Sequence, residues 1–242
     1  MRRVPTLLLF LLLILPRVAC GASATVPMAD GFDFPVGPPD AEGYYKSRGF
    51  RSSHHMGDDW NGVAGGNSDY GAPVYCVGHG IVVYARDARM GWGNLVIVRH
   101  AYLEGSIPQV VDSVYAHLSR ISIREGQQVR KRQLIGGIGT NRGMYTAHLH
   151  FEIRRNLRIG PFQGQFARDF SNYHDPTRFI TARRKLPGTG RTAVVSLDIA
   201  RAVFRNDLPP TTIFLKIARA IAAARSAELH AFFTPIGNHN RQ

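Results

Sequence analysis

The chain has 242 residues, of which 44% are hydrophobic and 10% aromatic, and this composition supports a buried core and excludes wholesale disorder. Lys and Arg total 30 against 17 Asp and Glu, so the formal net charge is +13. Such a basic surface favours a polyanionic partner, but charge alone does not choose among nucleic acid, an anionic membrane and an anionic wall polymer.

Residues 1–24 have the layout of a secretory signal peptide. Arg2 and Arg3 form a short basic start, and residues 7–15 are an unbroken run of Leu, Phe and Ile. Residues 22–24, Ala-Ser-Ala, place small residues at the spacing that signal peptidase needs. The apolar run is too short for a permanent span, which takes about 20 residues. We therefore expect an exported protein of the periplasm, cell envelope or medium, with no stable membrane span after signal removal.

The two cysteines bear on anchoring and on disulfides. A cut after Ala24 removes Cys20 and leaves Cys76, so no intrachain disulfide is expected in the mature chain. A lipoprotein would keep Cys20 as its acylated first residue, but Arg17 stands where the lipobox wants an aliphatic residue. Lipid anchoring through Cys20 is therefore the weaker alternative.

Three segments follow the signal region. Residues 25–50 are rich in Gly, Pro and Asp, which predicts an extended arm without a helix. In residues 51–182, short β-branched or aromatic runs alternate with Gly-containing turns, which predicts a mostly β, antiparallel domain. Residues 183–242 form a basic extension that we expect to be partly helical. The expected strands are 73–77, 80–84, 94–99, 110–116 and 149–153, and the expected helical stretches are 194–204 and 212–232.

Three short clusters hold four of the histidines, and the one at residues 115–118 places His117 at the end of a β-branched run. His55 and Asp59 are four residues apart, so a turn at Gly57 would bring an imidazole and a carboxylate to one ion. His148 and His150 alternate with apolar residues, so on a strand they point to the same side. Two imidazoles on one face of an otherwise apolar strand are costly unless they are bound or hydrogen-bonded. This pair is therefore the most informative of the clusters.

Together the clusters fit a catalytic zinc site, which has three protein ligands and an open position for water. His55, Asp59 and one of the two histidines at 148 and 150 would be the ligands. The other histidine and His117 would be left for proton transfer and for stabilising an oxyanion. The sequence contains no His-Glu-x-x-His, which excludes a thermolysin-like helix site.

In this order, the motifs strongly resemble those of the lysostaphin/LytM-type peptidoglycan zinc metalloendopeptidases. The family pattern His-x-x-x-Asp, Tyr-Ala-His-Leu and His-Leu-His-Phe-Glu is matched at residues 55–59, 115–118 and 148–152. Intervening segments match as well, with Gly-Ala-Pro-Val at 71–74 and Gly-Asn-Leu-Val-Ile-Val-Arg-His at 93–100. Several motifs in a fixed order make the resemblance specific.

The resemblance implies a role for each residue. His55, Asp59 and His150 would bind Zn²⁺. His148 would be the general base, and His117 would polarise the attacking water or stabilise the tetrahedral intermediate. The fold would be an antiparallel β-sheet domain with an open groove over the zinc site, and the substrate would be a peptide of the peptidoglycan stem or cross-bridge.

The sequence also departs from the family pattern. His54 beside His55 and Asp58 beside Asp59 make the ligand register ambiguous. We choose His55 and Asp59 because they keep the three-residue gap. Residues 60–70 form an extra Gly-rich loop, which we expect near the groove.

The resemblance covers residues 51–182, and three alternatives stand beside it. A catalytically inactive relative would bind the cell wall and activate other wall hydrolases, but such relatives typically lose metal ligands. A cupin-like barrel also has a His-x-His strand, but it would leave His55 and Asp59 unexplained. A nucleic-acid-binding module is suggested by charge alone, and no recognition helix, zinc finger or base-stacking motif supports it. We therefore expect peptidoglycan, and not nucleic acid, as the partner, with the oligomeric state left open.

Overall fold

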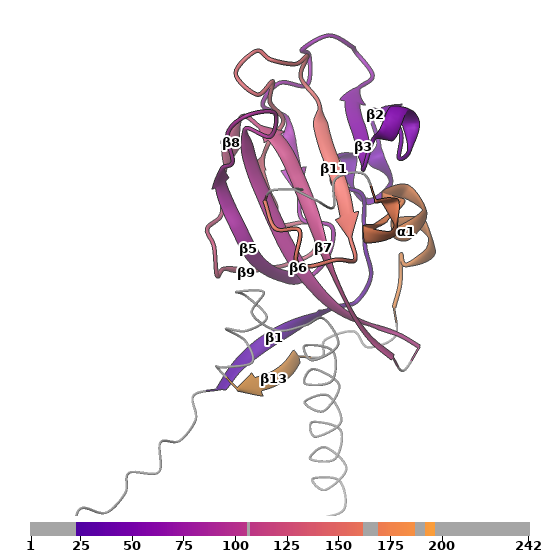
Figure 1. Ribbon diagram of the computed structural model, residues 1–242, viewed down its shortest axis with the longest axis vertical. Helices are drawn as coiled ribbons and strands as arrows, with labels where there is room; N and C mark the ends of the chain where they lie inside the picture. Colours follow the sequence, from indigo (N-terminus) through magenta and orange to yellow (C-terminus); the bar gives the residue numbers. More distant parts are fainter. Residues whose placement is uncertain (1–22, 106, 162–168, 187–191, 197–242) are drawn as a thin grey trace, which may run out of the picture.

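The structure is a computed structural model that describes residues 23–105, 107–161, 169–186 and 192–196. These residues form one ten-stranded sheet, one three-stranded sheet and a short helix at the side of the large sheet (Figure 1). In these parts of the chain, no helix is long and apolar enough to cross a membrane.

The large sheet is built mainly from antiparallel neighbours. Its strands are β1 (Ser23–Ala29), β2 (Tyr44–Arg48), β3 (Asp58–Gly62), β5 (Gly80–Asp87), β6 (Asn94–Glu104), β7 (Ile107–Leu118), β9 (Gln128–Val129), β11 (Leu149–Arg154), β12 (Tyr173–His174) and β13 (Thr192–Ser196). The spatial order is β13-β1-β6-β7-β11-β3-β2, with β5 pairing β6 and β9, and β12 pairing β11. β1 and β6 pair in parallel.

The remaining elements are short. The small sheet has the order β4-β10-β8, made of β4 (Pro73–Tyr75), β10 (Leu134–Gly137) and β8 (Arg120–Ile121). The helix α1 spans Pro176–Ala182, and short turns lie at η1 (Gly37–Ala41), η2 (Ser52–His54) and η4 (Phe170–Asn172). The predicted fold class, a mostly β antiparallel domain, is confirmed, and each of the five expected runs coincides with one of the strands β4, β5, β6, β7 and β11.

Strand β11 shows how the sequence pattern divides core from site. Leu149, Phe151 and Ile153 are fully buried and belong to the main hydrophobic core. Burial of each such side chain contributes about 1.5–3 kcal/mol. Successive side chains on a strand point to opposite faces of the sheet. Because Leu149, Phe151 and Ile153 face the core, His150 and Glu152 point to the other face.

Residues 25–50, expected as an extended arm, pack into the domain. Phe32 and Val36 are fully buried in the main core. The Phe32 ring meets the rings of Tyr102 and Phe179 edge to face, with centroids 5.5 and 5.0 Å apart. β2 then extends the sheet beside β3. The segment therefore belongs to the structural unit that carries the site.

The ends of the chain are described only in part. Val194, Val195 and Ser196, which we expected to begin a helix, lie in β13 and pair antiparallel with β1. Pairing with β1 and the β-branched side chains of Val194 and Val195 favour a strand here, although the apolar residues are spaced as in a helix. The other predicted helical residues and residues 1–22 of the signal peptide lie outside the described residues, and β1 begins at Ser23.

Candidate metal centre

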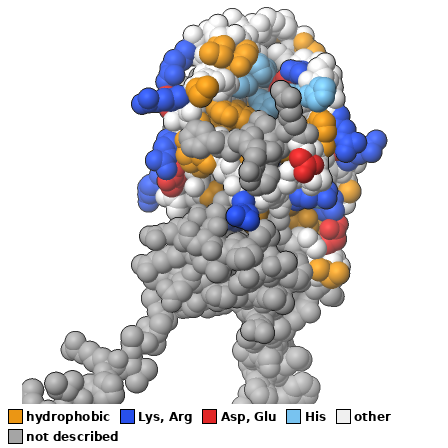
Figure 2. Space-filling view, in the orientation of Figure 1, with side chains coloured by type: hydrophobic (Ala, Val, Ile, Leu, Met, Phe, Trp, Pro, Cys, Tyr) orange, Lys and Arg blue, Asp and Glu red, His pale blue; other side chains and the backbone are white. Residues whose placement is uncertain are grey.

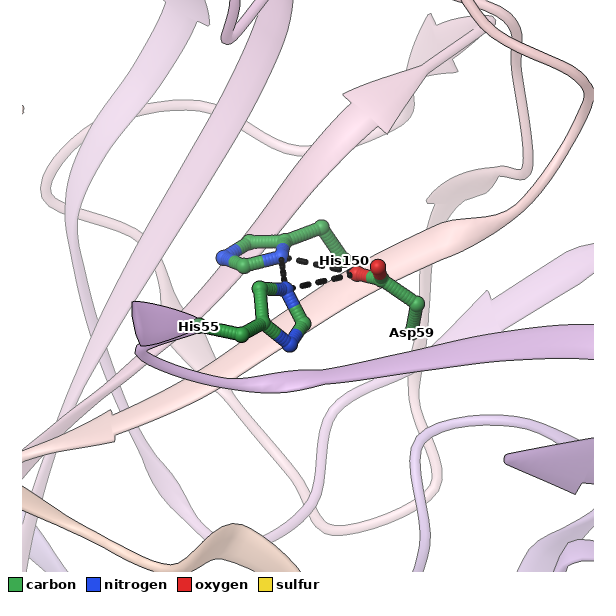
Figure 3. A group of neighbouring side chains, drawn as sticks. All are labelled: His55, Asp59 and His150. Carbon is green, nitrogen blue, oxygen red and sulfur yellow. Dashed lines mark hydrogen bonds and ion pairs between the residues drawn. The ribbon is translucent and has the colours of Figure 1, made fainter. Parts of the chain in front are cut away.

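Two neighbouring strands and the segment before one of them bring three side chains together. Asp59 on β3 lies directly opposite His150 on β11 in the antiparallel register, and His55 precedes β3 (Figure 3). Oδ1 of Asp59 is 3.1 Å from Nε2 of His55 and 2.9 Å from Nδ1 of His150. The two ring nitrogens are themselves 2.9 Å apart. One ligand atom from each side chain thus converges on a single point.

Position 57 has no room for a side chain, so only glycine fits there. A Cβ at this position would lie 2.3 Å from the carbonyl oxygen of Phe151 on β11. The glycine therefore lets the segment between His55 and Asp59 approach β11 closely. The sequence prediction assigned Gly57 to a turn, and the structure gives it a packing role instead.

Asp58 and Asp59 point to different surroundings. Asp58 is fully buried, and its carboxylate accepts hydrogen bonds from Phe50 N at 3.0 Å and Thr177 Oγ1 at 2.6 Å. It therefore ties the segment before η2 to α1. Asp59 is the acid that faces His55 and His150, which is the register chosen from the sequence.

All four histidines of the predicted site have one ring nitrogen against an oxygen that can only accept a hydrogen bond. The contacts are His55 Nδ1 to Gly49 O at 3.3 Å, His117 Nδ1 to Trp92 O at 3.3 Å, His148 Nδ1 to Thr146 O at 2.8 Å and His150 Nε2 to Glu152 Oε1 at 3.0 Å. Because that nitrogen carries the proton, the opposite nitrogen of each neutral ring keeps its lone pair. Such outer hydrogen bonds fix the tautomer of metal-binding histidines.

The electrostatics of the cluster favour a bound cation. Burial acts to raise the pKa of Asp59, but hydrogen bonds from His150 and His55 outweigh it and hold the pKa well below its usual range. Burial acts to lower the pKa of His150, but its contacts with Asp59 and Glu152 raise it to about 9. Without a metal ion, a proton on His150 therefore takes the place of a cation between the two carboxylates.

His117 and His148 lie beside the cluster. Nε2 of His148 is 3.8 Å from Oδ1 of Asp59, and the His117 ring centroid is 4.8 Å from that of His148 and 5.7 Å from that of His150. Burial, together with His150 and His148, lowers the pKa of His117 to about 3. His117 is therefore a neutral imidazole at ordinary pH.

A cavity of about 420 Å³ opens over the cluster, and histidine side chains gather in a hollow of the drawn face (Figure 2). The described residues that line it include Arg48, Trp92 and Tyr145 besides the histidines and Asp59. Residues 60–70 do not appear among them. Asn67 Oδ1 instead accepts from Ala147 N at 2.8 Å, so the extra loop braces the segment that precedes His148.

Two further residues lie behind His150, and neither was assigned a role from the sequence. Glu152 is fully buried, and its Oε2 accepts from Arg154 Nε at 2.5 Å. The guanidinium of Arg154 lies over the rings of Trp92 and Tyr173 and also bonds to Gly160 O. Both residues continue the i, i+2 alternation of His148 and His150 on β11, and this periodicity is the signal that could have found them.

Part of the chain matches a family of known proteins. Residues 58–161 match Peptidase family M23. Lipoprotein NlpD from Yersinia enterocolitica is 37% identical over 86 residues, which are 35% of this chain and 78% of that protein. The chain belongs to peptidase family M23. The family predicted from the motifs is thereby confirmed.

Other members of the M23 family match over similar segments. The Lipoprotein NlpD/LppB homolog of Pseudomonas aeruginosa is 41% identical over 94 residues, 38% of this chain and 29% of that protein. The murein hydrolase activator NlpD of Escherichia coli is 38% identical over 86 residues, 35% of this chain and 20% of that protein. The match therefore spans less than a third of these two relatives. Lysostaphin from Staphylococcus simulans superposes with a TM-score of 0.43 at 26% identity, covering 58% of this chain and 50% of that chain.

Proposed function

We propose that this M23 protein is an exported zinc-dependent endopeptidase that hydrolyses peptide bonds in the stem peptides or cross-bridges of peptidoglycan. The observation that carries the proposal is the convergence of His55 Nε2, Asp59 Oδ1 and His150 Nδ1 within 4.8 Å. The family assignment supports it independently, because the family is one of peptidases.

The donor set suits Zn²⁺. Two imidazole nitrogens and a carboxylate oxygen are ordinary zinc ligands, and three protein ligands leave a position open toward the cavity. Three electron-pair donors at 2.9–3.1 Å from one another repel unless a cation lies among them. We therefore assign His55, Asp59 and His150 as the metal ligands, with Glu152 fixing the tautomer of His150.

The remaining residues supply proton transfer. Bound Zn²⁺ would lower the pKa of a water and polarise the scissile carbonyl. His148 presents its Nε2 lone pair to the cavity, so it can take a proton from the attacking water and return it to the leaving amine. His117, held neutral by burial, presents the same kind of lone pair and can orient that water. Because His117 then has no proton to give on this side, the Tyr145 hydroxyl, which also lines the cavity, is a candidate neutral donor to a developing oxyanion.

Digestion of purified peptidoglycan tests the proposal. The mature protein is incubated with sacculi, with and without a zinc chelator, and the released fragments are read by mass spectrometry. We expect chelator-sensitive release of peptide-cleaved fragments, whose masses identify the bond. Intact stems and cross-links after incubation with zinc-loaded protein would overturn the assignment as an endopeptidase.

A second function is favoured by the relatives. The Escherichia coli protein is named a murein hydrolase activator, so a role as an activator of other wall hydrolases is the alternative. The variant Asp59→Asn, which removes a proposed zinc ligand, distinguishes the two functions. An activator would stimulate a partner hydrolase equally well with this substitution, whereas an endopeptidase would lose its activity.

We also propose an envelope location and the following division of the chain. Residues 1–24 would be the signal peptide, 25–50 the N-terminal segment packed on the domain, 51–182 the metalloendopeptidase domain and 183–242 the basic extension. The Yersinia and Pseudomonas relatives are named lipoproteins, which keeps acylation at Cys20 as the alternative to cleavage after Ala24. N-terminal sequencing of the mature protein distinguishes Thr25 from a blocked Cys20.

A further inference from the structure

A second cavity, of about 610 Å³, lies beside α1 and β12. No described residue lines both this cavity and the one over the metal centre. The described lining combines aromatic and apolar side chains with many cations. Its members are Phe50, Arg51, Arg155, Tyr173, His174, Asp175, Arg178, Phe179, Ala182 and Arg183.

The lining has a strong excess of hydrogen-bond donors. Four of the lining residues are arginines, and Asp175 is the one carboxylate among the residues that the structure places there. Arg155 Nη2 donates to Nδ1 of His174 at 3.2 Å, so the proton of this neutral imidazole lies on Nε2. Nε of Arg183 is buried and has no hydrogen-bond partner within the described part of the chain, while Nη2 of the same guanidinium is paired with Glu104, outside the lining. The cavity therefore offers donors and positive charge, which suits an acceptor-rich anion.

Two of the guanidiniums lie against aromatic rings. Arg51 lies over the Phe170 ring, 5.2 Å from its centroid, and Arg183 lies 4.5 Å from the centroid of Phe179. Arg178 Nε is 3.6 Å from a carboxylate oxygen of Asp175. Arginines that are already positioned lose less conformational entropy when they bind, and their planar forks match oxyanions bidentately.

The second cavity adjoins the metal centre through one tight turn. Phe50 and Arg51 line the second cavity, while His54 and His55 line the first. The two ends of the turn are joined by a hydrogen bond of 2.7 Å from Arg51 N to His55 O. Only the few residues of this turn separate the two linings along the chain.

We propose that this arginine-lined cavity binds carboxylate groups of the peptidoglycan strand and so seats the wall polymer beside the metal centre. The proposal rests on the proposed function, because it takes the same polymer as its ligand. Peptide stems carry free carboxylates, and arginine pairs with carboxylates through two parallel hydrogen bonds. The basic cavity would thus supply binding energy away from the bond that is cut.

Sedimentation of zinc-free protein with purified sacculi tests the proposal without catalysis. The variant is Arg155→Gln/Arg178→Gln, since both side chains are exposed. The matched control is Arg124→Gln/Arg130→Gln, which removes the same charge from exposed positions away from both cavities. We expect the first pair to weaken binding roughly fivefold to tenfold and the control less than twofold.

Chemical treatment of the sacculi identifies the anion with the wild-type protein. Amidation of the carboxylates should weaken binding as much as the double substitution does, whereas stripping phosphodiester-linked polymers with hydrofluoric acid should not. Equal weakening by the control pair, or loss of binding only after acid stripping, would overturn the proposal. Asp59→Asn should abolish zinc binding and keep sacculus binding, so failure of the endopeptidase assignment is seen separately.

Discussion

At the residue scale, the outer nitrogen of each histidine decides what its inner nitrogen can do. Nε2 of His150 donates a hydrogen bond to Glu152, and Glu152 is itself held by Arg154. His148 does the same with a backbone carbonyl oxygen, that of Thr146. Under the proposed function, these two chemically identical side chains on one strand would therefore serve different tasks, metal binding and proton transfer.

This division predicts opposite outcomes for two alanine variants. His148→Ala should bind zinc with wild-type stoichiometry and lose roughly 10²- to 10⁴-fold in the rate of hydrolysis, because it removes only the proton acceptor. His150→Ala should lose zinc and activity together. Zinc content by atomic absorption and fragment release from sacculi check both. Zinc loss in His148→Ala, with activity retained in His150→Ala, would reverse the assigned roles.

Glu152 offers a test of the outer hydrogen bond. Glu152→Ala removes the acceptor that holds the Nε2 proton of His150, so zinc affinity should fall roughly tenfold to 100-fold. Competition with a chromogenic chelator measures this directly. Glu125→Gln, an exposed carboxylate paired with Arg86, is the matched control and should leave the affinity unchanged. Unaltered zinc affinity in a folded Glu152→Ala protein would remove Glu152 from the site.

The sequence predicted the residue types of the centre because they are short-range signals. The i, i+4 spacing of His55 and Asp59 and the i, i+2 spacing of His148 and His150 are visible without a fold. Which nitrogen faces the metal depends on contacts such as that of His55 with Gly49 O, which arise only when the chain has folded. Tautomers could therefore not be predicted from the motifs.

At the scale of elements, the register of β3 against β11 builds the centre. Asp59 lies directly opposite His150, so a slip of one residue would turn Asp58 toward the site and Asp59 away from it. The burial of Asp58 against Thr177 and Phe50 N resists that slip. Strands such as β6, β7 and β11 were predictable from their β-branched runs. β2 and β3 consist largely of polar and glycine residues, so their sequences do not predict that they are strands or that they pair.

Gly57 makes this register testable. Gly57→Ala would place a methyl group 2.3 Å from the carbonyl oxygen of Phe151, so β3 and β11 must separate. We expect a loss of roughly 2–4 kcal/mol in the free energy of unfolding and weaker zinc binding. Gly49→Ala is the control in the same region, since its nearest neighbour would be a flexible Lys46 atom at 3.6 Å. Equal stability of the two variants in denaturant unfolding would contradict the close approach.

At the scale of the whole molecule, buried histidines couple stability to pH. Burial lowers the pKa of His100 and of His174 to about 4, with Arg155 and Arg183 adding to the effect at His174. Between pH 4 and 6.5 the unfolded chain binds these protons and the folded chain does not, so stability falls as the pH falls. His150 does not alter this window, because its raised pKa gives a contribution that is complete below pH 6.5 and is lost toward pH 9.

Because His100 is fully buried, its titration should lower the free energy of unfolding by roughly 3 kcal/mol as the pH falls from 6.5 to 4. Its Nδ1 donates to His79 O at 2.9 Å, and its Nε2 lies 2.7 Å from the Ser113 hydroxyl, so the ring is held on both sides inside the domain. Urea unfolding of the metal-free protein at several pH values measures the slope. His100→Gln should show a shallower slope, and an unchanged slope would exclude His100 as its source.

The last prediction concerns how much of the chain the domain needs. The motifs predicted a domain of residues 51–182, and residues on both sides of this range complete the core. Phe32 and Val36 are fully buried, and Arg184 Nη1 donates to Pro39 O at 2.6 Å. A fragment of residues 51–182 should therefore be insoluble or unfolded, since emptying the site of one buried Phe alone costs about 3–5 kcal/mol.

A fragment of residues 23–186 should fold and bind zinc, because it restores both buried side chains and the hydrogen bond from Phe32 N to Arg183 O. Circular dichroism and zinc stoichiometry compare the two fragments. A folded, zinc-binding 51–182 fragment would show that the N-terminal segment only covers a core that is complete without it. If only the longer fragment folds, the unit that supports the metal centre is wider than the motifs that identify it.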